Sequence, residues 1–531
     1  MPEHEGIRCP EGSLVVTHVS DHEWNFEYPR LEWAILEAFH DAIDDWHMGD
    51  VASAEETYRQ LVGDYPEFID AHHHLALLLS ETGREEEAFQ LWQDVVALGL
   101  ERLPQEFEIG RDRLSWPILE NRPFLRAYHA LGLEYFKREE VEQALEIFNN
   151  MLAMNPGDNQ GIRALVVDCN LRLNRPADAL EICNRYPGDG MEQLVYGRVL
   201  ALYQLGREAE AKTALNDAVS LLPLVAQELV KGLHLEPYKL LRPGYVTFGG
   251  ADQAYYYWTE QGQYWENTPG AIEFVRLHLG PQDHDPELVR QAQELPLRQD
   301  MVTLLTYVRD NKVVGTQSTG NMPLKAVREV TARFVNPPQL DTTIGDRTFR
   351  LRSEEDVWPL YFMHILAEVG DLLSIARARR WRLTRMGERF LDEAPFLQVT
   401  FLLEVWWHQV NWLIAYPFQG MGEALPPDFE RVALTQLRAL PLGTRISFEE
   451  FADALIEESG LTWTAPDSDY ATMSLRGSIE RMVIHILAGF DAVEREYREE
   501  PLGRGTISKL DAFEVTPFGK ALLDAVAVAS G

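Results

Sequence analysis

Small and bulky apolar positions recur at a helical spacing through the first half of the chain. Gly49, Ala54 and Tyr58 are followed 34 residues later by Gly83, Ala88 and Trp92. A similar order returns three more times: Ala144 and Phe148 before Pro156, Ala179 and Cys183 before Pro187, and Ala211 and Ala218 before Pro223. Two antiparallel helices per unit explain this pattern, because a glycine permits the turn, an alanine lets the helices approach and a proline ends the second helix. The pattern therefore predicts a row of five helical hairpins.

This arrangement resembles the tetratricopeptide repeat (TPR). The motif positions of that family are matched best by Gly132, Tyr135, Ala144, Phe148 and Pro156. The resemblance covers roughly residues 38–223 and implies an α-solenoid that binds other proteins. We therefore place an N-terminal segment at residues 1–39 and a TPR solenoid at residues 40–223.

An insertion separates the second unit from the third. Ala88 and Ala144 lie 56 residues apart instead of 34, so about 22 residues are added. The added part includes Leu103–Pro117, which is polar and interrupted by prolines. It is either a loop that shapes the binding face or an elongated connection, and we favour the second because solenoids tolerate insertions on one face.

A helical cap and connector are predicted at residues 224–295. Within them, residues 249–265 begin with two glycines and carry Ala254, Trp258 and Trp265 at helical spacing. The aromatic residues form either a ligand cage or the hydrophobic cap of the solenoid. We favour the cap, because a terminal repeat must cover its exposed face.

Two stretches of the second half share the spacing Thr-x-x-Gly-x-x-apolar-apolar. One begins at Thr384 and the other at Thr516, 132 residues further on. Each follows a short apolar piece typical of a strand, and each threonine can cap the helix that follows it. Helices, a turn, a strand pair and a closing helix describe a winged helix. We therefore predict two winged-helix-like domains, at residues 296–391 and 392–531.

The same half resembles the C-terminal segments of bacterial plasmid open-reading-frame-three-like proteins. The resemblance rests on the two Thr-x-x-Gly strings and on the order of the elements, and it implies no function for any residue here. The predicted fold class is mainly α: a TPR-like α-solenoid followed by two winged-helix-like α+β domains.

The chain is strongly acidic, with 84 acidic and 48 basic side chains among 531 residues and a formal net charge of −36. This excess disfavours non-specific nucleic-acid binding by the whole molecule and favours basic partners. Residues 41–235 carry 34 acidic and 17 basic side chains, so we expect the groove to prefer a basic or amphipathic segment of a partner protein. The family's carboxylate clamp is absent, because the corresponding helices present His73, Leu77, His129 and Leu133.

One region is basic. Residues 301–391 carry 14 basic and 10 acidic side chains. Eight residues form a candidate patch for nucleic acid or an acidic partner: Lys325, Arg328, Arg333, Arg377, Arg379, Arg380, Arg382 and Arg385. In this domain the helix that would enter a major groove is Leu324–Phe334. Its equivalent in the second domain, Ser447–Ser459, carries five acidic and no basic residues, so we favour protein docking over DNA contact.

Residues 396–418 form an apolar run long enough to cross a membrane. Four polar residues in its middle would be costly there, which favours a buried helix: Glu404, His408, Gln409 and Asn411. The start of the chain lacks a basic flank followed by an apolar run. Three cysteines have no close pair: Cys9, Cys169 and Cys183. We expect a cytoplasmic protein.

Motifs of enzymes and cofactor sites do not occur in the sequence. The consecutive residues His72, His73 and His74 point to different faces of a helix, so they cannot bind one metal together. We therefore predict a non-enzymatic adaptor without a cofactor, which holds other proteins through its solenoid and docking domains. Two alternatives stay open: a transcriptional regulator whose first winged helix touches DNA, and a non-catalytic subunit that activates a separate enzyme.

Overall fold

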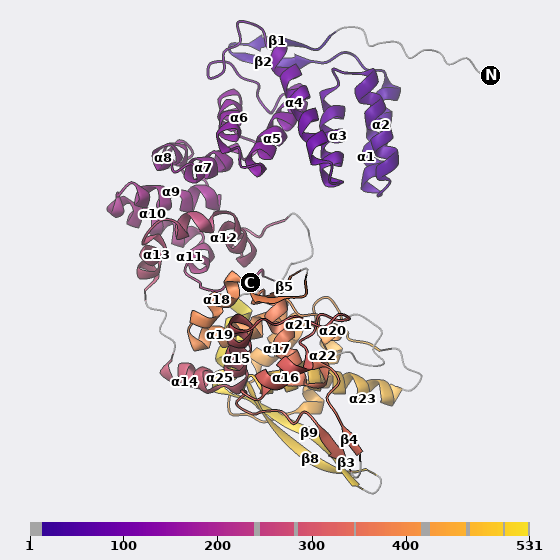
Figure 1. The fold of residues 1–531 in the computed structure, drawn as a ribbon. Coiled ribbons are helices and arrows are strands. Elements are labelled where there is room, and N and C mark those ends of the chain that lie inside the picture. Colours follow the sequence, from indigo (N-terminus) through magenta and orange to yellow (C-terminus); the bar gives the residue numbers. More distant parts are fainter. Residues whose placement is uncertain are drawn as a thin grey trace, which may run out of the picture. The chain divides into compact units, whose positions relative to one another are not determined.

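The computed structural model describes eight ranges of the chain: residues 13–237, 245–280, 285–344, 347–376, 378–415, 425–463, 468–502 and 505–528. In these ranges the protein is mainly helical and divides into two compact units (Figure 1). The first unit comprises Met1–Pro223 and Thr259–Phe274, and the second comprises Leu224–Trp258 and Val275–Gly531.

The first unit begins with a β-hairpin and continues as a row of helical hairpins. The antiparallel strands are β1 (Val15–Ser20) and β2 (Glu23–Glu27). The helical pairs are α1 (Trp33–His47) with α2 (Val51–Asp64), α3 (Ile69–Glu81) with α4 (Glu85–Glu101), α5 (Arg122–Lys137) with α6 (Val141–Met154), α7 (Ile162–Arg172) with α8 (Pro176–Arg185), and α9 (Glu192–Gln204) with α10 (Glu208–Leu221). A 3₁₀ turn at Leu119–Asn121 precedes α5. The repeated helical hairpin predicted from the spacing is confirmed.

Glycine makes the turn in three of these hairpins but is not required. Gly49, Gly83 and Gly206 have φ angles of 89°, 80° and 70°, a left-handed backbone that glycine adopts without strain. The third and fourth hairpins make the corresponding turn with Glu139 at φ 65° and Asn174 at φ 55°. The turn is therefore set by the packing of the two helices, and the residue at that position adapts to it.

The small residues lie where two helices cross. The four predicted crossing residues are fully buried: Ala88, Ala144, Ala179 and Ala211. Gly132 lies inside α5, where a Cβ atom would come within 2.5 Å of the Phe148 ring on α6. Helix approach, not turn formation, explains the glycine at that position.

We expect Ala144→Leu to lower the free energy of unfolding by about 1–3 kcal/mol, because the larger side chain overpacks a crossing without free volume. Ala209→Leu is the matched control, since Ala209 is exposed on α10. Thermal unfolding followed by circular dichroism compares the two variants. An equal melting temperature for both would contradict the tight crossing.

The insertion between α4 and α5 supports the N-terminal β-hairpin. The Trp24 amide donates to the Arg113 carbonyl over 3.0 Å, and the Arg113 amide donates to the His22 carbonyl over 2.8 Å. The buried Asn121 side chain accepts from the Phe26 amide and donates to the Trp24 carbonyl, each over 3.1 Å. The added residues therefore form an ordered support for a hairpin that the sequence pattern did not predict.

The last hairpin is followed by the short helix α11 (Pro223–Leu229) and then by α12 (Ala251–Glu266) and α13 (Ala271–Leu279). Thr259 and the residues after it on α12 belong to the first unit. Ala254 and Trp265 are both buried, but Ala254 belongs to the second unit and Trp265 to the first.

The second unit contains two helical groups, each closed by a strand pair and a final helix. The first group comprises α14 (Pro286–Glu294), α15 (Pro296–Asp310), α16 (Leu324–Thr331), β3 (Thr342–Ile344), β4 (Arg347–Phe349), a 3₁₀ turn at Glu354–Asp356, α17 (Trp358–Val369), β5 (Leu373–Ile375), β6 (Trp381–Leu383) and α18 (Arg385–Asp392). The second comprises α19 (Pro395–His408), α20 (Trp412–Ala415), α21 (Phe429–Ala439), β7 (Ile446–Ser447), α22 (Phe448–Ser459), α23 (Ser468–Ile479), a π-helical stretch at Glu480–His485, α24 (Ile486–Gly489), β8 (Val493–Leu502), β9 (Gly505–Val515) and α25 (Pro517–Val528).

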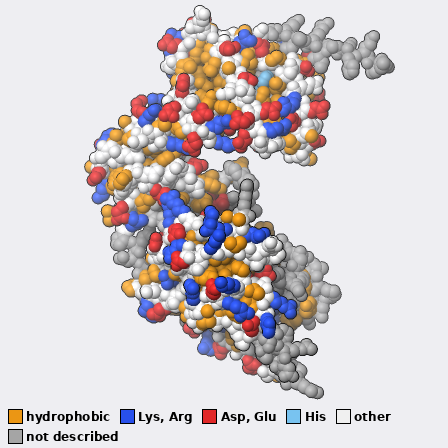
Figure 2. Space-filling model, viewed as in Figure 1, with side chains coloured by type: hydrophobic (Ala, Val, Ile, Leu, Met, Phe, Trp, Pro, Cys, Tyr) orange, Lys and Arg blue, Asp and Glu red, His pale blue; other side chains and the backbone are white. Residues whose placement is uncertain are grey.

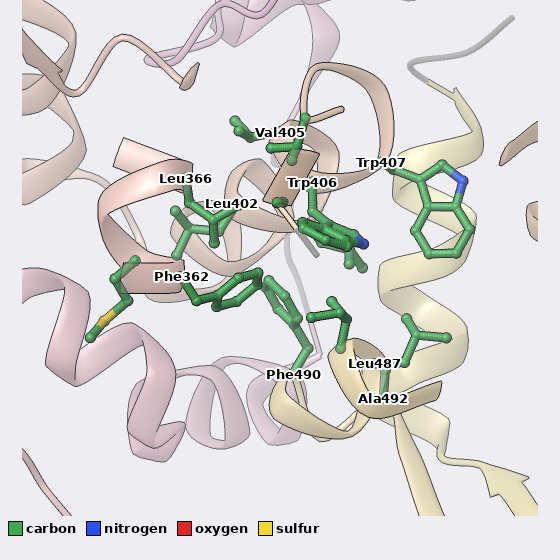
Figure 3. Packing of buried hydrophobic residues seen from close by; sticks show 14 of the residues in the cluster. Phe362, Leu366, Leu402, Val405, Trp406, Trp407, Leu487, Phe490 and Ala492 are labelled. Atoms are coloured by element: carbon green, nitrogen blue, oxygen red, sulfur yellow. The ribbon is translucent and has the colours of Figure 1, made fainter. Parts of the chain in front are cut away.

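Helix α19 runs through the apolar core of this unit. Trp406 and Trp407 are almost completely buried. Figure 3 shows Trp406 beside Phe362 of α17 and Phe490, which follows α24, and the rings of Trp406 and Phe362 lie 5.4 Å apart. One apolar cluster therefore joins both predicted winged-helix ranges. Only part of the expected buried helix over residues 396–418 is found: α19 ends at His408, α20 follows at Trp412–Ala415, and residues 416–418 lie outside the described residues. No helix in the described ranges is long and apolar enough to cross a membrane.

The Thr384 string closes the first group through a set of backbone contacts that we name the latch. The Thr384 amide donates to the Leu372 carbonyl over 3.2 Å, and its hydroxyl donates to the Asp371 carbonyl. The same hydroxyl accepts from the Gly387 amide over 3.0 Å and so caps α18. Asp371 has a left-handed φ of 51°.

The Thr516 string forms the same latch in the second group. The Thr516 amide donates to the Ala492 carbonyl over 3.1 Å, its hydroxyl donates to the Asp491 carbonyl over 2.8 Å, and it accepts from the Gly519 amide over 2.8 Å. Asp491 has a φ of 52°. The two predicted Thr-x-x-Gly caps are confirmed and belong to a repeated structural unit.

The strands of the two groups follow one order. In the second group β7, β9 and β8 lie side by side in that order. In the first group Val314 pairs with Arg380, the residue just before β6. Val314 therefore lies against β6 as β7 lies against β9 in the second group. The main difference is the length of the hairpin, because β8 and β9 have 10 and 11 residues whereas β5 and β6 have 3 each.

Candidate binding groove

Part of the chain itself lies against the last two helical hairpins. The Tyr264 hydroxyl of α12 donates to the Asp168 carboxylate of α7 over 2.5 Å. The Trp265 ring lies 6.5 Å from the Tyr196 ring of α9 in an edge-to-face arrangement. The same face of α7 and α9 is thus covered by α12.

The segment after α12 continues along α9. The Gln204 side-chain amide donates to the Thr268 hydroxyl over 2.9 Å, and the Tyr203 ring lies 5.0 Å from the Phe274 ring of α13. Residues 264–274 therefore occupy a groove formed by the first helices of the fourth and fifth hairpins. This occupied groove shows which register positions of a hairpin face a bound helix.

The same register positions in the first three hairpins carry apolar side chains. Asp168 lies eleven residues before the buried Ala179, and counting back equally from Ala144, Ala88 and Ala54 gives Leu133, Leu77 and Ile43. Because each alanine marks the same helix crossing, these three residues share the groove face of α5, α3 and α1. Leu133 is 41% exposed, whereas the covered Asp168 is 8% exposed. We name Ile43, Leu77 and Leu133 the open stripe.

Two histidines lie behind the open stripe. His73 and His129 each stand fifteen residues before the alanine of their hairpin, which is the position of Tyr196 in α9. The His73 ring is buried and lies 3.3 Å from the Trp92 indole nitrogen, which donates to it. Burial lowers the pKa of His73 to about 3 and also lowers the pKa of His129, so both rings are neutral parts of the groove floor.

The neighbouring histidines bond to their own helix. A ring nitrogen of His72 lies 3.0 Å from the Phe68 carbonyl, and one of His74 lies 2.8 Å from the Asp70 carbonyl. No group of three metal-ligating side chains occurs among the described residues. His72 and His74 are thus held by carbonyls of the preceding turn.

A cavity of about 660 Å³ lies at the start of α1 and α3, and no residue of the open stripe lines it. Its lining is mostly apolar and includes Tyr28, Pro29, Leu31, Leu36, Tyr65, Pro66, Phe68, Leu98 and Pro123. Trp33, between two of these lining residues, is 77% exposed. An exposed tryptophan and an apolar cavity are each typical of a protein-binding surface. Sequence reasoning missed this cavity, because its walls come from four separate segments.

Several charged side chains on and beside α3 to α5 form ion pairs. Arg126 lies 2.7 Å from the Asp70 carboxylate, and Lys137 lies 2.8 Å from Glu85. Arg138 pairs with Glu134 over 2.9 Å. These pairs leave the acidic excess of residues 41–235 unchanged, because each joins one acidic and one basic side chain.

The predicted basic patch is divided between two elements. On α16, Lys325 lies 3.8 Å from Glu329, and Arg328 lies 3.2 Å from Asp341. Arg333, just after α16, lies over the Tyr307 ring at 5.2 Å.

The other members lie on or beside the β5–β6 hairpin: Arg379, Arg380, Arg382 and Arg385, all exposed. Arg377 lies outside the described residues. Figure 2 shows several basic side chains gathered on the viewed face of the second unit. The helix before this hairpin is α17, not the predicted Leu324–Phe334, and α17 contains no lysine or arginine.

The contact between Asp168 and Tyr264 predicts a pH dependence of the first unit. Burial raises the pKa of Asp168 to about 6, although the hydrogen bond from Tyr264 opposes the rise. The folded unit therefore binds this proton more tightly than the unfolded chain, and its stability falls as the pH rises from about 4 to about 6.

Asparagine does not titrate, so Asp168→Asn should not lose stability between about pH 4 and about pH 6 as the parent does. The free energy of unfolding of the variant minus that of the parent should therefore rise over this pH range, by up to about 3 kcal/mol. Urea unfolding at both ends of the interval measures the difference, with Asp178→Asn at an exposed position of α8 as the control. If the stability of Asp168→Asn relative to the parent is the same at both pH values, the assigned burial of this carboxyl is contradicted.

The comparisons with known proteins agree with the helical hairpins. Two family models described as tetratricopeptide repeat match the chain, at residues 42–104 and 135–201. These stretches contain α2 to α4, α6 to α8, the end of α1 and most of α9, so TPR units are shown for this part of the solenoid. A search of the curated proteins finds no match.

Several solved structures are similar to the solenoid part. A TPR protein from Parabacteroides merdae is 16% identical, with a TM-score of 0.29, and the match covers 36% of this chain and 68% of that one. YrrB, described as a TPR protein with an unusual peptide-binding site, is 14% identical, with a TM-score of 0.28 and coverages of 36% and 87%. MamA is 16% identical, with a TM-score of 0.28 and coverages of 35% and 90%.

Proposed function

We propose that this protein is a non-enzymatic adaptor whose solenoid binds an amphipathic helix of a partner protein along α1, α3 and α5. The observation that carries this proposal is the chain's own α12, which lies on the equivalent face of α7 and α9 through Tyr264 and Trp265. The open stripe continues that face and leaves Leu133 exposed to a ligand. TPR units commonly mediate contacts between proteins, which is consistent with this role.

The open stripe defines the chemistry of the partner helix. Its three apolar residues lie on successive hairpins, so the ligand needs apolar side chains along one face, at positions such as i, i+3 or i+4, and i+7. The acidic excess of residues 41–235 favours basic residues on the opposite face of that helix. The apolar cavity at the start of α1 and α3 would take one further apolar side chain of the partner.

For the second unit we propose two winged-helix-like groups that dock proteins. The repeated order of helices, strand pair and closing helix supports this description. Helix α17 takes the position before the hairpin, but it is largely buried and carries no basic residue, which favours docking over insertion into DNA.

Cys169 and Cys183 are free thiols, which suits a cytoplasmic protein.

A photo-crosslinking amino acid placed at Leu133 tests the adaptor proposal. Leu221 is the matched control, because it is also a leucine of the solenoid and is 45% exposed, close to the 41% of Leu133. We expect one defined protein to be crosslinked at position 133 in cells, and its crosslinked peptide to be an amphipathic helix. Equal labelling of that protein from position 221 would contradict a binding role of the groove.

A further inference from the structure

The β5–β6 hairpin presents three arginines that the described part of the chain leaves without a carboxylate partner. Arg379, Arg380 and Arg382 are exposed, and none of them lies within ion-pair distance of a described carboxylate. In contrast, Arg328 on α16 is paired with Asp341. We name the three unpaired residues the arginine tip.

The backbone of the arginine tip is held in place by the segment after α15. The Trp381 amide donates to the Val313 carbonyl over 3.1 Å, and the Gly315 amide donates to the Arg379 carbonyl over 2.7 Å. The buried Trp381 indole donates to the Gly320 carbonyl over 3.0 Å. The three side chains therefore project from a fixed backbone, which lowers the entropy that a ligand must remove on binding.

Arg379 also adopts an unfavourable backbone conformation. Its φ of 55° lies in the left-handed region, where glycine is unstrained and asparagine or aspartate is commoner than arginine. A structural turn alone would be served better by one of those residues. Backbone strain of this kind concentrates at functional sites, which directs attention to this guanidinium.

The surrounding charges favour a short ligand. Asp371 at the base of the hairpin, Glu368 on α17 and Glu388 on α18 are all exposed. An extended phosphate backbone that crosses the hairpin would meet these carboxylates, and the chain as a whole carries a net charge of −36. A short acidic segment of a protein can contact the arginine tip without passing Asp371, Glu368 and Glu388. Guanidinium groups bind carboxylates through two parallel hydrogen bonds.

We propose that the arginine tip docks an acidic segment of a partner protein, with its guanidinium groups on aspartate or glutamate side chains. This second docking surface lies in the second unit and does not depend on the groove of the solenoid. The protein would then combine an apolar site for an amphipathic helix with a separate cationic site.

A fluorescein-labelled oligoglutamate peptide serves as the probe, and its anisotropy is measured with the full-length protein at low ionic strength. The triple variant R379Q/R380Q/R382Q should weaken binding at least about tenfold, because each lost guanidinium removes a charge-assisted hydrogen-bond pair. The control R290Q/R431Q/R438Q makes the same change of charge at three exposed arginines of the second unit that already have carboxylate partners. The control should retain the affinity of the parent within about twofold.

Equal weakening by the two triple variants would overturn the proposal, because net charge alone would then explain binding. Failure of the parent to bind the peptide more tightly than the arginine-tip variant would overturn it as well. A DNA duplex of equal charge is tested in the same way. If the parent binds the duplex more tightly than the peptide, and R379Q/R380Q/R382Q does not bind it, the ligand of the arginine tip is nucleic acid and the proposal of an acidic protein segment is overturned. Circular dichroism of both variants checks that they are folded.

Discussion

Gly519→Ala is expected to destabilise the second unit by about 3 kcal/mol or more. A Cβ atom at this position would lie 1.9 Å from the Ala492 carbonyl oxygen. That oxygen belongs to the backbone and accepts the Thr516 amide, so it cannot move aside without breaking the latch. Gly387→Ala should have a similar effect, because its Cβ would lie 2.2 Å from the Leu372 carbonyl oxygen in the equivalent latch.

Gly477→Ala provides the matched control for both glycine variants. Gly477 lies in α23, and nothing lies within 4 Å of the Cβ that alanine would add. Alanine should stabilise that helix by about 0.5–1 kcal/mol, because it restricts the unfolded chain. Chemical unfolding followed by tryptophan fluorescence measures all three variants. A Gly519→Ala variant as stable as Gly477→Ala would refute the close approach in the latch.

Leu133→Glu is expected to weaken binding of the crosslinked partner helix by about thirtyfold. Replacing a buried leucine contact with a carboxylate costs about 2 kcal/mol at an apolar interface. The affinity of the partner's amphipathic peptide for the full-length parent and variant can be measured by calorimetry. Raising the salt concentration should weaken both complexes, since the acidic solenoid also attracts basic residues of the peptide.

Leu221→Glu should change that affinity by less than about twofold, because it alters an equally exposed leucine away from the open stripe. Both leucines are substantially exposed, so neither variant is expected to change the melting temperature of the first unit appreciably. Equal losses of affinity in the two variants would place the partner elsewhere on the protein.

The repeat was predictable because it depends on contacts between neighbouring helices. Ala88 and Ala144 are small because two helices cross there, and such local crossings repeat along the sequence. Only the helix cap of the latch was predictable for a similar reason, since Thr384 caps the helix that follows it within three residues. The β-hairpin at the N-terminus was not, because its support comes from Arg113 and Asn121 far along the chain.

The candidate groove was predictable only in part. The sequence placed Leu77 and Leu133 on the groove helices, but it emphasised the acidic charge of the region. Asp70 and Glu85 find basic partners on another hairpin, over distances of 56 and 52 residues along the chain. A charge count does not show which carboxylates are paired, so it does not locate the unpaired acidic charge in the groove.

By itself, the sequence of this protein determined its helical hairpins, their crossing residues and the two helix caps of the second half, because each depends on residues close together in the chain. Tertiary structure decided which parts of those elements are available to a partner. Leu133 and Asp168 hold the same register position, yet α12 folds back over Asp168 and leaves Leu133 exposed. Arg328 and Arg380 look alike in the sequence, but Asp341 neutralises only the first. The exposure of a side chain and its ion pairs depend on contacts between distant segments of the chain. The local periodicity of the sequence does not predict such contacts.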